Sequence, residues 1–174
     1  MQLTGAGNAE GTGMPQVGSY LQKKGGRAMK SMLSSLFSRL TPLSDLERLI
    51  LEEAKACLSP ETAVLWQRQV DEINDVQRAV GGGGIALRRT LRGKPVFNES
   101  IAFPNKAAAL HVATVVLQVD GGFAPVNAFV SSSEGFLSSI VYEGNAAYLE
   151  QLSKAKQAFE ISVEAHCIND PSVV

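Results

Sequence analysis

The spacing of apolar residues along the chain changes from a helical period to a strand period near residue 84. Apolar side chains recur every three or four residues over 44–80, which predicts a helical hairpin. Ser44 stands three residues before Glu47, as in a capping box, and Ser59 predicts the cap of the second helix. The four glycines at 81–84 are expected to end that helix.

Beyond the glycines the apolar positions alternate, which favours strands. Residues 85–97 predict a basic hairpin that turns at Arg92. Residues 109–119 are mostly apolar at both odd and even positions, as in a central strand that is covered on both faces. The segments 126–131 and 136–142 are joined by a short glycine-containing loop, which predicts a second hairpin and an antiparallel meander.

The C-terminal third of the chain predicts a helix followed by a strand. Asn145 can cap a helix over 146–158. Residues 159–167 then show the clearest alternation of apolar and polar positions in the chain. Because one face of that strand is polar, we expect it near an edge of the sheet or in a sheet that is covered on one side only.

The N-terminal region has a different character. Residues 1–27 are rich in glycine and poor in apolar periodicity, which predicts a flexible tail. Residues 28–40 form an apolar stripe at helical spacing, so we expect a short helix that docks on the core or contacts a partner or a membrane surface. The expected organisation is the tail followed by a single domain over 28–174.

These elements predict an α+β fold. We expect a helical hairpin packed on a mostly antiparallel sheet of four or five strands, with one helix before the last strand. This layout is similar in size and class to that of many small bacterial proteins, among them single-domain immunity proteins that neutralise a toxin by binding it.

Charge is balanced overall but segregated along the chain. The net charge is −1, which does not favour a dedicated nucleic-acid or anionic-membrane protein. Residues 41–77 nevertheless carry eight acidic and three basic side chains, whereas residues 78–106 carry six basic side chains against Glu99. The candidate binding residues are therefore an acidic and a basic set: Asp45, Glu52, Glu53, Asp71, Glu72 and Asp75, and Arg88, Arg89, Arg92 and Lys94.

Catalytic and metal-binding patterns are absent from the sequence. Cys57 and Cys167 lack CxxC spacing, so we expect neither a disulfide framework nor a zinc knuckle, and a reducing compartment is favoured. The glycines at 81–84 precede a strand rather than a helix, which argues against a phosphate loop. His111 lies in an apolar strand, where a satisfied core position is the common role. No cofactor or metal is expected.

Three functions remain open. The leading hypothesis is a non-enzymatic protein-binding module, immunity-like or self-associating, whose acidic surface meets a basic partner or the basic hairpin of a second copy. The alternatives are nucleic-acid binding through the hairpin at 88–94, and a small hydrolytic or ligand-binding site that uses His166 and Glu164. No apolar run is long enough to span a membrane and no leader pattern is present, so we expect a cytoplasmic protein.

Overall fold

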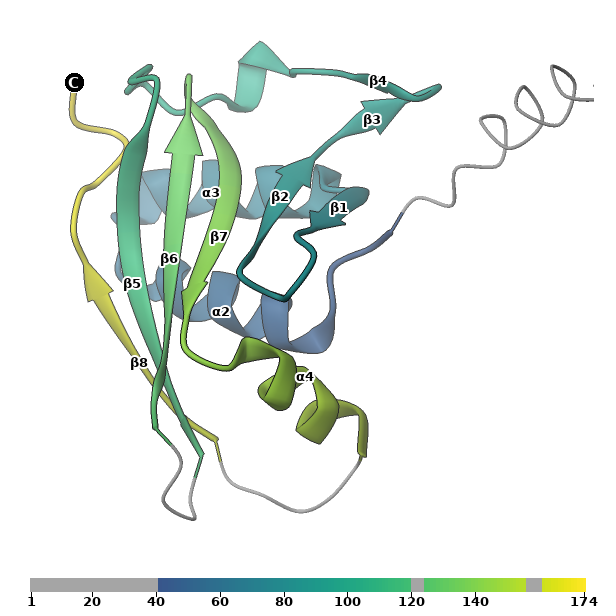
Figure 1. Ribbon diagram of the computed structural model, residues 1–174. Helices are drawn as coiled ribbons and strands as arrows, with labels where there is room; N and C mark the ends of the chain where they lie inside the picture. Colours follow the sequence, from purple (N-terminus) through teal and green to yellow (C-terminus); the bar gives the residue numbers. More distant parts are fainter. Residues whose placement is uncertain (1–40, 120–123, 156–160) are drawn as a thin grey trace, which may run out of the picture. The chain divides into compact units, whose positions relative to one another are not determined.

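The computed structural model describes residues 41–119, 124–155 and 161–174 (Figure 1). The predicted tail at 1–27 and the predicted helix at 28–40 lie outside the described residues. The elements in chain order are α2 (Asp45–Ala56), α3 (Pro60–Glu72), β1 (Asp75–Arg78), β2 (Gly84–Arg88), β3 (Thr90–Leu91), β4 (Lys94–Pro95), the 3₁₀ helix η1 (Glu99–Ile101), β5 (Leu110–Val119), β6 (Val126–Ser133), β7 (Phe136–Glu143), α4 (Ala146–Ala155) and β8 (Ile161–Cys167).

Helix α2 begins at a capping box, as the sequence predicts. The Ser44 hydroxyl accepts a hydrogen bond from the Glu47 N–H at 3.3 Å, and the Glu47 carboxylate accepts one from the Ser44 N–H at 2.7 Å. The Glu47 side chain is buried, and its charge is balanced by the Arg78 guanidinium at 2.7 Å. The start of α2 is thereby tied to β1.

Helix α3 is shorter than the sequence predicts. It is capped by Ser59, as expected, but it ends at Glu72, and Ile73 already has an extended backbone. Asn74 then forms hydrogen bonds with the C=O and the N–H of Thr90, at 2.9 and 2.8 Å. The predicted continuation of the helix to residue 80 is therefore wrong. Val76 fits a helical stripe as well as a strand, and pairing with β2 decides in favour of the strand.

The glycines at 81–84 form the turn of the β1–β2 hairpin rather than the end of a helix. Gly81 and Gly82 have φ angles of 90° and 76°, which glycine adopts without steric cost. Gly84 begins β2, and a Cβ atom at this position would lie 2.9 Å from the carbonyl oxygen of Ile140 in β7. Gly81 and Gly82 are thus needed for the turn, and Gly84 is needed for the close approach of β2 to β7.

Six of the eight described strands form one sheet in the order β1-β2-β7-β6-β5-β8, in which every neighbouring pair is antiparallel. The predicted meander, β5–β6–β7, is confirmed. The sheet has more strands than the four or five expected because β1 comes from the segment assigned to the second helix. The short β3–β4 hairpin forms a separate sheet and turns at Arg92 and Gly93, as predicted.

Helices α2 and α3 lie against one face of the six-stranded sheet (Figure 1). Side chains on this face of β5, such as Val115 and Leu117, are fully buried, whereas Thr114 and Val116 on the opposite face are half-buried. Trp66 of α3 is also fully buried, and its indole N–H donates to the carbonyl oxygen of Leu51 in α2 at 3.1 Å. The α+β class is confirmed.

The predicted helix before the last strand is present as α4. The Asn145 side chain accepts a hydrogen bond from the Tyr148 N–H at 3.1 Å, so the predicted cap is confirmed. Strand β8 follows at the edge of the sheet, beside β5, as its alternating pattern predicts. Its apolar residues Val163 and Ala165 pack against the core, and Glu164 and His166 are exposed.

Cys57 and Cys167 form a disulfide, with their Cα atoms 5.6 Å apart. The sequence predicted no disulfide, because these residues are 110 positions apart and have no recognisable spacing. Packing of α2 against β8 brings the C-cap residue of the helix next to the last residue of the strand. The prediction is therefore wrong, because spacing along the sequence does not show that the two cysteines lie close together in the fold.

The C-terminal residues fold back onto the start of α3. The Asp170 carboxylate accepts hydrogen bonds from the Thr62 hydroxyl at 3.2 Å and from the Ser172 N–H at 2.8 Å. Burial raises the pKa of Asp170, but hydrogen bonds from Ser172, Thr62 and the Ser59 backbone outweigh it, so that its pKa is lowered from the ordinary value of 3.8. This carboxylate fastens the end of the chain to the helical layer.

Candidate functional site

A groove of about 440 Å³ opens where the end of α3, the end of β2 and the start of β7 meet the segment 95–98. Most of its wall is apolar, and the larger apolar side chains come from four separate stretches of the chain. They are Ile73, Leu87, Val96, Phe97, Ile101, Phe136 and Leu137. A groove of this size and composition is typical of a binding site.

One buried amide, that of Gln69, holds the inner wall of the groove together. Its Nε2 donates to the carbonyl oxygens of Ile101 at 2.8 Å and Gly135 at 3.1 Å, and its Oε1 accepts from the Leu137 N–H at 2.7 Å. The residue is 5% exposed. Gln69 therefore links α3 to η1 and to the β6–β7 turn, and it fixes the spacing between them.

The sequence analysis did not single out Gln69. A signal was present, because Gln69 lies three residues after Trp66 and four before Ile73, on the apolar stripe of α3. A polar residue on such a stripe requires buried hydrogen-bond partners.

A second part of the wall is held by the carboxylate of Glu72, at the end of α3. One of its oxygens lies 2.6 Å from Nη1 of Arg89, and the other accepts a hydrogen bond from the Asn98 side chain at 3.1 Å. Glu72 and Arg89 belong to the predicted acidic and basic sets, and the structure pairs them within one chain. This ion pair fastens the β3–β4 region to the end of α3.

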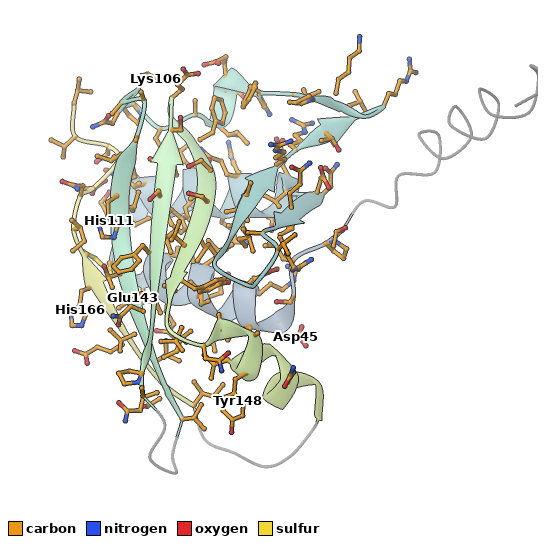
Figure 2. All side chains as sticks on the ribbon, in the orientation of Figure 1. Asp45, Lys106, His111, Glu143, Tyr148 and His166 are labelled. Atoms are coloured by element: carbon orange, nitrogen blue, oxygen red, sulfur yellow. A yellow bond between two sulfur atoms is a disulfide. The ribbon has the colours of Figure 1, made fainter. Side chains whose placement is uncertain are left out.

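The outer rim of the groove is aromatic. Phe97 is 66% exposed, and its ring centre lies 5.2 Å from that of Phe136. The Lys106 ammonium lies 5.3 Å from the centre of the Phe136 ring and 3.0 Å from the Glu99 carboxylate. Figure 2 shows Lys106 at the end of the sheet where β5 begins. The Phe97 ring thus packs against Phe136 and is open to solvent.

Three of the four predicted basic residues carry exposed side chains at or near this groove. Arg88 lines it, and it lies opposite Asp75 in the register of β1 and β2. Arg92 occupies the β3–β4 turn, and Lys94 begins β4. Among the residues that the structure describes, these three cations form no ion pair within 4.0 Å. They give the hairpin side of the groove a positive charge.

The predicted acidic residues do not converge on one site. Glu52 pairs with Lys55 on α2, and the Asp71 carboxylate accepts a hydrogen bond from Gln67 on α3 at 2.9 Å. Glu53 is half-buried on α2, and Asp75 begins β1. Asp45 is exposed at the start of α2. Of the six, Glu72 alone lines the groove described above.

Neither of the two histidines lines the groove, and Figure 2 shows both on the side of the sheet where β5 and β8 lie. His166 Nε2 is 3.7 Å from the Glu164 carboxylate, and both side chains are more than half exposed. His111 is half-buried: its Nε2 lies 3.1 Å from the Ala113 carbonyl oxygen and from the Thr114 hydroxyl, and its ring meets that of Phe129 edge-on. The described residues contain no cluster of three or more potential metal ligands.

Within the described ranges, no helix has the length and apolar character needed to cross a membrane. Comparison of the chain with protein-family models, with curated proteins and with solved structures gave no match.

Proposed function

We propose that the chain is a non-enzymatic protein-binding module that holds an extended segment of its partner in the groove beside Phe97. The observation that carries the proposal is the apolar groove of about 440 Å³ with a 66% exposed aromatic ring at its rim. Exposed apolar surface of this kind is a common feature of protein-binding sites, and aromatic residues often dominate the binding energy there.

The shape of the rim favours an extended segment as the ligand. In the described residues β4 pairs only with β3, so the outer edge of Lys94 and Pro95 is free of a neighbouring strand. Because Pro95 has no N–H to donate along this edge, a bound extended segment would be held mainly by alternate side chains that enter the groove. The groove beneath Val96 and Phe97 would take one or two apolar side chains.

Charge indicates the composition of the segment. Arg88, Arg92 and Lys94 are exposed and form no ion pair in the described part of the chain, whereas the Glu72 charge is already balanced by Arg89. An apolar segment flanked by Asp or Glu would therefore match the hairpin side of the groove. In this proposal the groove and the basic hairpin replace the acidic helical surface as the main site.

The test is selection from a library of apolar peptides flanked by acidic residues, followed by binding measurements on two variants. Phe97→Asp places a charge at the rim and should weaken a selected peptide by about tenfold or more. Val64→Asp is the matched control, because Val64 is also exposed, at 54%, but lies on α3 away from the groove wall. Selected peptides that bind both variants as they bind the wild type would contradict the proposal.

Nucleic-acid binding is the second candidate, and the cations of the β3–β4 hairpin beside exposed Phe97 favour it. It predicts retention on single-stranded oligonucleotides that weakens steeply with salt and is lost in Arg92→Glu.

A cytoplasmic location also stays a proposal. In a reducing compartment Cys57 and Cys167 would be two thiols, so their redox state in cells bears on it directly.

A further inference from the structure

Within the described residues, no strand pairs with the outer edge of β8. Strand β8 is the last strand of the sheet, and its register with β5 is unbroken from Ile161 to Cys167. The other end of the sheet is partly closed, because the outward N–H of Val76 in β1 donates to the Thr41 carbonyl oxygen at 2.8 Å. Figure 1 shows no element beyond β8 in the described part of the chain.

The backbone groups that face this open edge can be identified. The Ile168 N–H donates to the Val112 carbonyl oxygen at 2.9 Å, which places Ile168 in a hydrogen-bonded pair with β5. Because such pairs alternate along an antiparallel ladder, the N–H and C=O groups of Val163, Ala165 and Cys167 point away from β5. A row of outward groups like this is a template for another strand.

Two features that commonly prevent an edge strand from pairing, a proline and a β-bulge, are missing from β8. Strand β8 contains no proline, and its register with β5 has no bulge. Its charged residues, Glu164 and His166, lie on the exposed face of the sheet and not across the edge. Val163 and Ala165 are only partly buried on the helical face, because no neighbouring strand covers their outer side.

We propose that two copies of the chain pair antiparallel through their β8 edges, with the two-fold axis at Ala165. In this register Glu164 of each copy lies opposite His166 of the other, on the same face of the joined sheet, so each carboxylate can accept a hydrogen bond from the imidazole N–H that faces it, at two places in the dimer. The outward groups of Ala165 bond to those of the second Ala165, and Val163 bonds to Cys167 of the other copy.

Neighbouring registers are less favourable. Moving the axis by one residue to Glu164 places two glutamates directly opposite each other, which is destabilising. Moving it to His166 places two histidines opposite each other and leaves Glu164 facing Ile168. The charge pattern of β8 therefore selects the axis at Ala165, and the second copy is the occupant that complements it.

The test is the concentration dependence of the mass of the full chain, measured by sedimentation equilibrium, in four proteins. The wild type should dimerise. His166→Glu should weaken the dimer about tenfold, because two carboxylates would then face each other at both contacts, and combining it with Glu164→Lys should restore the affinity. Gln118→Glu is the control, since Gln118 is exposed on β5, one strand in from the edge, and this variant should dimerise like the wild type.

A fifth protein tests the backbone contribution. Ala165→Pro removes an N–H that β5 does not use, so the chain should fold and stay monomeric, with the fold checked by circular dichroism. A wild type that remains monomeric up to about 1 mM would overturn the proposal. So would a dimer of unchanged affinity in both His166→Glu and Ala165→Pro, because its interface would then lie elsewhere.

Discussion

Gln69 is the residue on which the shape of the groove depends most. Its amide makes all of its hydrogen bonds to backbone groups of η1, the β6–β7 turn and β7, in a position that is almost closed to water. An apolar residue of similar size would fill the space but remove the Gln69 bonds to the Ile101 carbonyl oxygen and the Leu137 N–H, whereas the Gly135 carbonyl oxygen still accepts from the Phe103 N–H at 2.8 Å. Each buried group left without a partner costs about 1–3 kcal/mol.

We therefore expect Gln69→Leu to lower the free energy of unfolding by about 2–4 kcal/mol, measured by urea denaturation. Gln67→Leu is the matched control, because Gln67 lies on the same helix and its bonds, a part-buried one from Lys55 and an exposed one to Asp71, involve side chains that water can also reach. That variant should change stability by no more than about 0.5 kcal/mol. Equal losses in the two variants would contradict the role given to Gln69.

Asp170 gives the stability of the fold a dependence on pH. Because its pKa is lower in the folded chain than the ordinary 3.8, the ionised carboxylate stabilises the fold above that pH. The contribution is lost as the pH falls through the folded pKa. Asp170→Asn should therefore be less stable than the wild type at neutral pH, and the difference should shrink below about pH 4 in urea denaturation curves. A difference that is the same at low and neutral pH would contradict this assignment.

At the scale of the elements, the disulfide joins the end of α2 to the end of β8. Because it closes a loop of 110 residues, it restricts the unfolded chain strongly. Cys57→Ser should lower the free energy of unfolding by about 2–5 kcal/mol under oxidising conditions. A reductant should lower the stability of the wild type to the level of the variant and leave the variant unchanged. A wild type with two free thiols after oxidation would contradict this link.

The helices and strands could be predicted from the sequence wherever one local signal dominated. Ser44, Ser59 and Asn145 placed the helix starts correctly, and alternation in β8 placed it at an edge. The region after Glu72 could not be predicted, because the hydrogen bonds of Asn74 to Thr90 come from a segment sixteen residues away. The cysteine pair and the groove also depend on contacts between distant segments, which spacing alone does not indicate.

The candidate site was predicted only in part. The basic hairpin was recognised from Arg88, Arg89, Arg92 and Lys94, and two of these four line the groove. Its apolar wall was missed, since Ile73, Leu87 and Leu137 each look like ordinary core residues in their own segments. Only the fold shows that these side chains surround a common space.

At the scale of the whole molecule, the groove and the β8 edge are separate surfaces. The groove wall contains no residue of β8 or β5, so the proposed dimer leaves it open. The chain could then bind two partner segments per dimer, and the His166→Glu variant should bind a selected peptide with the affinity of the wild type.

The measurement that tests the central claim most directly is amide hydrogen exchange of the full chain with and without a selected acidic, apolar peptide. Binding in the groove predicts slower exchange at 86–89, 96–98 and 133–138, which supply most of the groove wall. It also predicts that Phe97→Asp abolishes this protection. Protection confined to α2 or to β8 would contradict the claim and would place the binding surface elsewhere on the molecule.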